Sequence, residues 1–324
     1  MEVKRRTART LVKKLSSVSE QTRAEALCEL RLISKNDADS RTIIAEAGAV
    51  PYLAEALYSS SHDFQENAAT TLLNLSISSP TGGGETPDCT RRTIISTRGV
   101  LDAISHLLIN HQHSAAAAVQ SAAATLHSLL ILEDSYRPLI GGKRDILYAL
   151  IDIIRCHNSP PRSIKDALKA LFGVSLYTQN RAAVIELGAV PPLFSLVVLD
   201  GRVGFVEDAT AVIAQIAGCE EGVEAFRKAS AVGVLVDLLD PATGSTGRIK
   251  ENAVSALLNL VQCGGQRLAD DIRKETLGLY AWINDVAENG SAKGKSKAGA
   301  LLNLLGGGSY GFRETRLFPS PQST

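Results

Sequence analysis

An eleven-residue pattern occurs twice in this 324-residue chain. It reads ENAATTLLNLS at 66–76 and ENAVSALLNLV at 251–261. We call the place of Asn74 in this pattern the anchor position. Weaker copies extend the series of anchor positions to Arg31, Asn74, Ser128, Gly173, Gln215, Asn259 and Asn303, in steps of 43, 54, 45, 42, 44 and 44 residues. A repeat of about 44 residues is typical of solenoids built from units of two or three helices.

A second pattern precedes the first within a unit. The segment EAGAVPYLAEAL at 46–57 returns as ELGAVPPLFSLV at 186–197, and the fourth unit has GGKRDILYAL instead. Gly48 and Gly188 stand where a short helix must end in a left-handed residue. Pro51 and Pro191 fit the first turn of the next helix, where a missing N–H costs nothing. Each unit is therefore predicted to be a short helix, a sharp turn, a second helix, a loop and a third helix with the anchor.

The third helix of the second unit has a wide apolar face. The residues of that face are Ala68, Ala69, Leu72, Leu73 and Leu75. Asn67, Thr70 and Asn74 lie on another face. One such unit cannot bury its apolar face alone, so stacked neighbours must bury it together. Aromatic residues make up only 5% of the chain and Ala and Leu are abundant, which favours helices over sheets.

The whole chain is predicted to form one all-α solenoid over 1–308. Its seven units lie near 1–38, 39–87, 88–134, 135–178, 179–218, 219–263 and 264–308. The long step between anchors contains SPTGGGETPD, which predicts an inserted flexible loop at 79–88. The end of the chain is rich in Gly, Ser and Pro, and we predict a disordered tail at 309–324.

The balance of charges, the cysteines and the length of the apolar runs indicate which kinds of partner and which compartment to expect. The chain has 34 Lys and Arg residues against 34 Asp and Glu residues, whereas nucleic-acid binding normally shows a basic excess. Five cysteines lie far apart without a C-x-x-C pair, which is typical of reduced thiols in the cytoplasm or nucleus. The apolar runs are shorter than the ~18–20 residues that span a bilayer. We therefore expect a cytoplasmic or nuclear protein, without a nucleic-acid partner or a membrane span.

Motifs for catalysis and for cofactors are lacking in the sequence. The segment KGKS at 293–296 resembles a phosphate-binding loop, but the glycine required at 289 is Asn289. His111 and His113 are interpreted as surface histidines, because no nearby cysteine or acidic residue completes a metal site. No serine, cysteine or histidine stands in a nucleophile motif. We expect no cofactor, no metal ion and no enzymatic activity.

The two patterns resemble the armadillo repeat family, whose signature is E-A-G-A-[IV]-P-x-L followed after a loop by E-N-A-x-x-x-L-L-N-L-S. The resemblance covers residues 8–306 and is best in the second and sixth units. It implies a right-handed superhelix of about seven three-helix repeats. Within this family, the opening TLVKKLSSVSEQTRAEALCELRLISKNDADSRTIIAEAGAVPYL is most similar to the repeat region of plant U-box ubiquitin ligases.

In those ligases, the U-box docks a ubiquitin-conjugating enzyme and the repeats hold a substrate or a regulator. No segment of this sequence has the C-P-I-[ST]-x-x-x-M-x-D-P-V-like opening of a U-box, so we expect no ligase activity from these residues. Importin α, another armadillo family, pairs each anchor asparagine with a Trp four residues earlier to hold basic peptides. No anchor here has that Trp, and Trp282 lies elsewhere.

The leading hypothesis is a non-enzymatic module that binds an extended peptide or a partner protein in a concave groove lined by third helices. The candidate groove residues are Asn67, Thr70, Asn74, Ser128, Lys169, Asp208, Gln215, Asn252, Ser255, Asn259 and Asn303, with Arg31, Ser121 and Asp166 on the same faces. Two roles are open for the anchor asparagines. Their amides can grip the backbone of a bound peptide, or they can bond backbone groups of the solenoid itself.

Two alternatives to this hypothesis are kept. The resemblance to U-box ligases favours a substrate-recognition part of such a ligase, either as a fragment of a longer chain or acting in trans. Components or substrates of ubiquitin ligases would then be the partners. The repeat architecture alone is also compatible with a purely structural scaffold.

Overall fold

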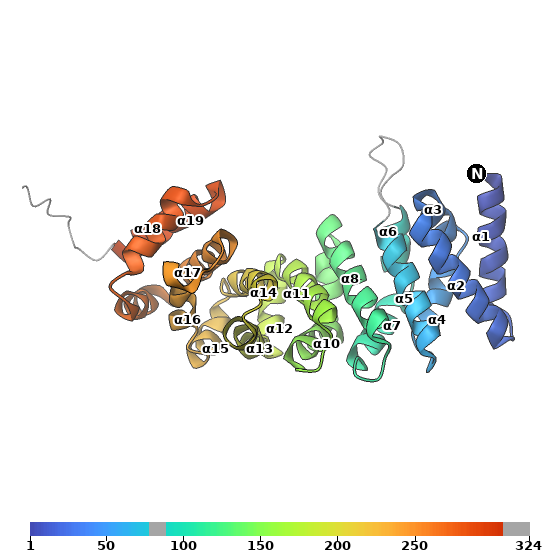
Figure 1. Cartoon of the computed structure of the whole chain (residues 1–324), viewed down its shortest axis with the longest axis horizontal. Coiled ribbons are helices and arrows are strands. Elements are labelled where there is room, and N and C mark those ends of the chain that lie inside the picture. Colours follow the sequence, from blue (N-terminus) through green and yellow to red (C-terminus); the bar gives the residue numbers. More distant parts are fainter. Residues whose placement is uncertain (78–88, 307–324) are drawn as a thin grey trace, which may run out of the picture.

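The computed structural model describes residues 1–77 and 89–306, and these ranges are helical throughout, with short connections. They contain nineteen α-helices, three short 3-10 helices and one π-helix, and no strand among the described residues. The helices stack into an elongated arc from α1 to α19 (Figure 1). The predicted all-α solenoid is thus confirmed. The predicted loop at 79–88 and the predicted tail at 309–324 lie outside the described residues.

The helices follow the predicted order within the units. The first helices of units two to six are α3 (Ala38–Glu46), α6 (Cys89–Ser96), α9 (Tyr136–Gly141), α12 (Arg181–Glu186) and α15 (Val223–Lys228). The second helices are α4 (Ala49–Ala56), α7 (Val100–Ile109), α10 (Arg144–Arg155), α13 (Val190–Ser195) and α16 (Ala231–Asp237). The third helices are α5 (His62–Ser76), α8 (Ala116–Leu132), α11 (Pro161–Ser175), α14 (Val203–Ile216) and α17 (Gly247–Glu275).

The two end units differ from the predicted three-helix plan. The first unit has two helices, α1 (Glu2–Leu15) and α2 (Glu20–Asn36). The last unit consists of the end of α17, followed by α18 (Leu279–Asn289) and α19 (Ala292–Gly306). Gly265 interrupts α17 with a φ of 63° and a ψ of −154°, close to the predicted unit boundary at 263/264.

Short 3-10 and π segments extend several helices. The 3-10 helices η1 (Thr178–Asn180) and η3 (Glu220–Gly222) lead into α12 and α15, and η4 (Pro241–Thr243) lies between α16 and α17. The π-helix η2 (Leu196–Asp200) continues α13. No single described helix is long and apolar enough to cross a membrane; one bent pair, 178–186 with 190–200, passes the length and composition test at an angle of 85°.

The glycines of the second pattern take the predicted backbone conformation. Gly48 and Gly188 are left-handed, with φ values of 84° and 82°. Gly99 takes the same conformation before α7. At the equivalent turn of unit six the residue is Ser230, which adopts a φ of 50° although it has a Cβ atom. A left-handed residue with a side chain costs roughly 1–2 kcal/mol, so this turn is strained.

Arginines of the first helices close the ends of the preceding third helices. Each donates its Nε–H to a carbonyl in the last turns of the third helix before it. The pairs are Arg41 with Ser34 (2.7 Å), Arg91 with Ser76 (2.7 Å), Arg137 with Leu130 (3.1 Å) and Arg181 with Ser175 (2.8 Å). Carbonyls at a helix C-terminus lack intrahelical partners, so these bonds join each unit to the next.

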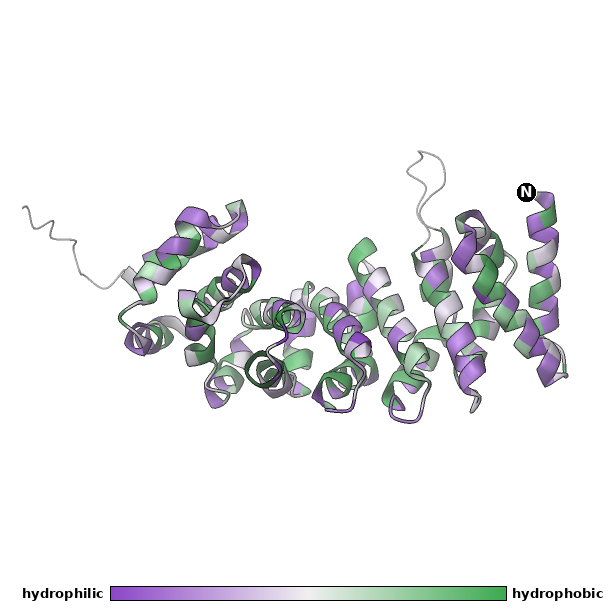
Figure 2. Cartoon of the chain, viewed as in Figure 1, coloured by the Kyte–Doolittle hydropathy of each residue, from purple (hydrophilic) through white to green (hydrophobic). Residues whose placement is uncertain are grey.

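The core runs along the third helices. Ala68, Ala69, Leu72 and Leu75 of α5 are at most 1% exposed, as predicted from the apolar face. Leu73 is only half-buried, so its predicted place in the core was wrong. It follows Leu72 by about 100° around the helix, which takes it past the edge of the packed face. Figure 2 shows hydrophilic residues along much of α1, which packs one face on α2 and α3.

The left-handed turns predict opposite effects for two substitutions. Ser230→Gly should raise the free energy of unfolding by about 0.5–1 kcal/mol, because strain is relieved at some entropic cost in the unfolded chain. Gly48→Ala should lower it by about 1–2 kcal/mol through the backbone alone, since a Cβ at Gly48 would meet no atom within 4 Å. Thermal melts followed by circular dichroism measure both. A Ser230→Gly variant that melts below the parent would contradict the strain.

Candidate binding groove

The candidate residues come from one continuous row of helices. α2, α5, α8, α11, α14, α17 and α19 pack one after another along the solenoid. Figure 1 shows α8, α11, α14 and α17 on the side toward which the arc curves, with the second helices on the opposite edge. The third helices therefore line the concave face, where the candidate groove residues were placed.

These residues differ widely in exposure. Asn74, Ser128 and Ser255 are buried, each 8% exposed. The half-buried candidates are Asn67, Thr70, Lys169, Asp208, Gln215, Asn252 and Asn259. Asn303 on α19 is exposed. A partner in the groove would therefore reach only part of the predicted set without a rearrangement.

The asparagines reach back to the preceding unit. Asn74 donates its Nδ2–H to the Ser34 hydroxyl at 3.0 Å, and Asn259 donates to the Ala214 carbonyl at 2.7 Å. Asn252 donates to the Glu207 carbonyl at 3.2 Å and lies 3.1 Å from the Thr210 hydroxyl. The Asn259 contact fits the second of the two roles, a bond to a backbone group of the solenoid, whereas Asn74 bonds within the solenoid to a side-chain hydroxyl.

Other candidates also make contacts between units. Ser128 donates its hydroxyl to the Ser76 carbonyl at 3.1 Å, and the hydroxyls of Thr70 and Ser121 are 3.3 Å apart. Arg31 of α2 pairs with Glu66 of α5 at 2.9 Å, whereas Gln215 accepts a bond from Arg181 of its own unit at 3.2 Å. We call this series of polar contacts between neighbouring third helices the polar seam.

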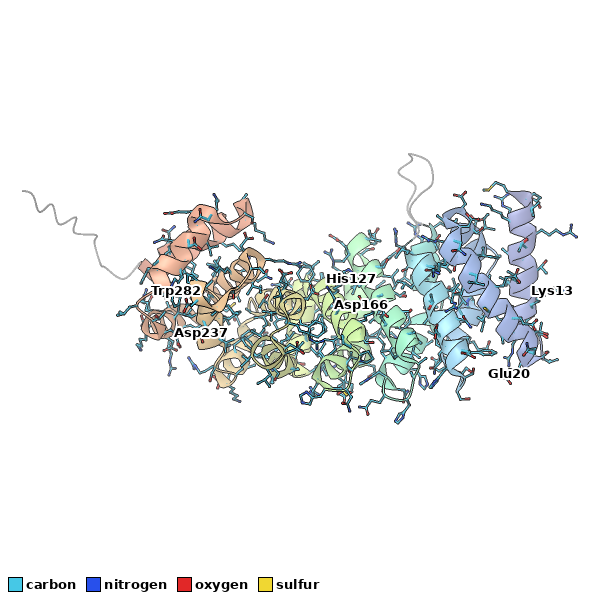
Figure 3. The ribbon with its side chains drawn as sticks, in the orientation of Figure 1. Lys13, Glu20, His127, Asp166, Asp237 and Trp282 are labelled. Atoms are coloured by element: carbon cyan, nitrogen blue, oxygen red, sulfur yellow. The ribbon has the colours of Figure 1, made fainter. Side chains whose placement is uncertain are left out.

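A hollow of about 340 Å³ opens between α8, α11, α14 and α17. We call it the central hollow; its wall includes His127, Lys165, Lys169, Phe172, Asp208 and Arg248. Figure 3 labels His127 and Asp166 at the middle of the arc. Of the predicted groove residues, Lys169 and Asp208 are thus brought together in one site.

The charges around the central hollow are only loosely paired. Arg248 lies 3.7 Å from Glu207 and 3.8 Å from Asp208, and Lys169 lies 3.7 Å from Asp166. Lys165 is exposed and forms no ion pair with a described residue. The Oδ2 atom of Asp208 is buried and has no hydrogen-bond partner among the described residues.

Burial shifts the titration of two groups in the central hollow. It raises the pKa of the Asp208 carboxyl, although Lys165 and Arg248 act in the opposite direction. Burial lowers the pKa of His127, so this imidazole is neutral at pH 7. The His127 Nδ1 atom lies 3.2 Å from the Lys169 carbonyl, and a neutral ring can donate its proton there.

Three basic residues in the wall of the central hollow, Lys165, Arg248 and His127, were absent from the predicted groove residues. Lys165 and Arg248 each stand four residues before a predicted residue, Lys169 and Asn252. Residues at that spacing share a helix face, so the rule for i and i+4 neighbours would have found both. His127 directly precedes the anchor of its unit, about 100° around the helix, and no pattern in the sequence marks it.

The histidines were partly misread. His111 was predicted to be a surface residue, but its side chain is 5% exposed and its Nε2 lies 3.1 Å from Asp152 of the next unit. The acidic partner is 41 residues away in sequence, so local inspection missed it. His113 is exposed as predicted. Within the described ranges, no group of three or more His, Cys, Asp or Glu residues could hold a metal ion.

The polar seam predicts a clear order of stabilities among three matched substitutions. Asn74→Ala and Asn259→Ala should each lower the free energy of unfolding by about 1–3 kcal/mol, because each leaves a group of the preceding unit without its partner. Asn303→Ala is the control at the same anchor position, and its exposed side chain predicts a change within about 0.5 kcal/mol. Urea titrations measure all three. Equal stability of the three variants would show that the seam contributes nothing.

Asp208→Asn should make the folded chain more stable at neutral pH. A raised folded-state pKa means that folding disfavours the carboxylate, so the native protein loses stability as the pH rises through its ordinary value of 3.8 and above. The neutral amide has no such loss. The gain should therefore be largest near pH 7 and shrink toward pH 4. Urea midpoints across this range test it; a variant less stable at pH 7 would mean that pairing with Arg248 outweighs burial.

Comparison with known proteins gives a consistent family. Residues 8–305 match the model of the plant U-box protein ARM repeat region. U-box domain-containing protein 17 of Arabidopsis thaliana is 30% identical over 306 residues, which are 94% of this chain and 39% of that protein. U-box domain-containing protein 4 of Oryza sativa subsp. japonica is 32% identical over 304 residues, again 94% of this chain and 39% of that protein. The chain spans about two fifths of the length of these relatives.

Solved structures show the same fold. An engineered protein of the Northeast Structural Genomics Consortium has a TM-score of 0.64 at 24% identity, covering 79% of this chain and 97% of that one. A designed armadillo repeat protein has a TM-score of 0.50 at 20% identity, covering 92% and 99%. These identities show a common fold and no more. With the family match spanning nearly the whole solenoid, the chain belongs to the family of plant U-box protein armadillo repeat regions.

Proposed function

We propose that this chain is a non-enzymatic interaction module that holds a segment of a partner protein in its concave groove. The observation that supports this best is the Oδ2 atom of Asp208, a residue in the wall of the central hollow; this atom is buried and has no hydrogen-bond partner among the described residues. Buried polar atoms are nearly always hydrogen-bonded, and an exception calls for an explanation such as a missing ligand. A backbone N–H or a side-chain donor of a bound peptide would supply the missing bond.

The polar groups that lack a partner within the described part of the chain support contact of the bound protein with charged residues of the central hollow rather than with the asparagines. The asparagines of the polar seam already bond the preceding unit. In the central hollow, Lys165 has no ion-pair partner and the Oδ2 atom of Asp208 has no hydrogen-bond partner among the described residues. Leu168 and Phe172 lie in the same wall. We therefore propose that Lys165, Lys169 and Asp208 contact the partner, and that Asn74 and Asn259 hold the groove in shape.

Capture with matched variants tests this function. Wild-type chain, Asp208→Asn and Lys165→Ala are used as baits in plant extract, with Asp237→Asn as the control; Asp237 is an exposed carboxylate at the end of α16. Proteins retained by the wild type and by Asp237→Asn, but reduced at least about 5-fold with the groove variants, fit a loss of roughly 1 kcal/mol. Identical protein sets on all baits would leave the scaffold role as the better description.

A second function is favoured by the family match: recognition of substrates for a U-box ubiquitin ligase, within a longer chain or in trans. This polypeptide, supplied with activating and conjugating enzymes, should then form no ubiquitin chains, because no dock for the conjugating enzyme is among its repeats. Immunoblots for ubiquitin measure the reaction, with a U-box ligase as the positive control. Robust chain formation by the polypeptide alone would show a catalytic module in these residues.

We also propose that the protein works in the cytoplasm or the nucleus. Its five cysteines are free thiols in the structure, spread over four of the units. Free thiols persist where the redox environment is reducing. Fluorescence microscopy of a tagged chain in plant cells checks the location.

A further inference from the structure

A second hollow, of about 430 Å³, lies outside the groove, where units four and five meet. It is formed by the loop after α10, the start of α11, and α13 with its continuation η2. We call it the outer hollow. α10 and α13 lie on the edge of the arc opposite the third-helix row (Figure 1). A ligand here would not compete for space with one in the central hollow.

The wall of the outer hollow offers donors to an anion. Ser159 is 8% exposed, and its Oγ has no hydrogen-bond partner among the described residues. The 15-residue helix α11 begins two residues later, at Pro161, and no side chain caps its N-terminus. Pro160 and Pro161 have no N–H. The first donors at this N-terminus are therefore the N–H groups of Arg162 and Ser163, and such groups favour negative charge. Exposed Arg155 and His157 stand in the same wall.

The carboxylate in this wall already has a cationic partner. Asp200 is its one carboxylate among the described residues, and it accepts two bonds of 2.6 Å from Arg202. Arg155 has a weaker partner, Asp152 at 3.6 Å, which is also engaged by His111. The chain as a whole has a net charge of +0, so a cationic wall is a local feature.

Apolar side chains border the outer hollow. Leu199 of η2 lies in its wall and is 76% exposed, and the adjacent Val198 is 59% exposed. A neighbouring hollow of about 380 Å³ shares Leu199 and Pro191 with the outer hollow. The exposed Lys228 lies in the wall of this neighbouring hollow. π-helical turns such as η2 are frequent at functional sites. Leu199 thus forms an apolar ridge between two hollows that both contain cations.

We propose that this outer surface docks an acidic segment of a partner protein. An apolar side chain of the segment packs against Leu199 and fills the outer hollow. A neighbouring carboxylate is bound by Arg155 and by the Ser159 hydroxyl at the N-terminus of α11. Charge complementarity selects an acidic partner over a basic one. The surface is separate from the groove, so its failure would leave the proposed groove function untouched.

Labelled peptides test this docking. The probe is fluorescein-labelled Glu-Glu-Leu-Phe-Glu-Glu, with Gln-Gln-Leu-Phe-Gln-Gln and Glu-Glu-Ala-Ala-Glu-Glu as matched peptides, and fluorescence polarisation on the full chain gives Kd. The probe should bind at least about 10-fold more tightly than either matched peptide, which corresponds to ~1.4 kcal/mol. Arg155→Ala should weaken binding about 10-fold, and Leu199→Ser should weaken it by a similar factor. Lys13→Ala, which removes an exposed cation from α1, is the control and should leave Kd unchanged.

The native thiols report where the probe binds. Cys156 lies in the wall of the outer hollow, whereas Cys28 lies on α2. Saturating probe should slow alkylation of Cys156 by N-ethylmaleimide, read by mass spectrometry, and leave Cys28 unchanged. The proposal is overturned if no probe binds at ~1 mM, if Arg248→Ala of the central hollow weakens binding while Arg155→Ala does not, or if Cys156 is not protected.

Discussion

The contact of each third helix with the next is the interaction on which the rest of the structure depends. No unit has a closed core of its own, and residues such as Leu72 and Leu75 become buried only when neighbouring units stack. The distance between these helices limits what the anchor position can hold. In unit four, a Cβ on Gly173 would lie 2.8 Å from the Leu130 Cβ of α8. The fourth unit thus departs from the asparagine pattern because α8 and α11 approach too closely for a side chain.

Stacking also leaves helix ends and polar faces that must be satisfied. The recurring arginines bond the C-terminal carbonyls of the third helices, and the polar seam bonds their flanks. In unit six, Val223 begins α15 where Arg181 begins α12, so this arginine contact has no counterpart there. Asn259 instead donates to the Ala214 carbonyl near the end of α14. One requirement, satisfied carbonyls between units, is met by different side chains in different units.

Much of the fold could be predicted because its signals are local. A left-handed glycine and a proline in the next turn determine backbone geometry over a few residues, and Gly48 and Gly188 took the expected conformation. The site was harder to predict. An anchor asparagine that binds a peptide and one that bonds the neighbouring unit are the same residue on the same helix face. Only the position of the neighbouring unit decides between them. The partners of Asn74 and His111 lie 40 and 41 residues away, beyond any local pattern.

The units that match the repeat pattern less well contain the buried side-chain atoms that lack a hydrogen-bond partner among the described residues. Buried side-chain atoms without partners in the described part of the chain belong to Arg23, Ser105, Ser159, Ser163 and Asp208. All lie in units one, three, four and five. Units two and six, which match the family signature best, have Asn74, Asn252 and Asn259 bonded across the seam. Departures from local rules are expected at functional or strained sites, which is consistent with the proposed binding surfaces in these units. Units four and five contribute to both hollows, and the central hollow also takes Arg248 from unit six.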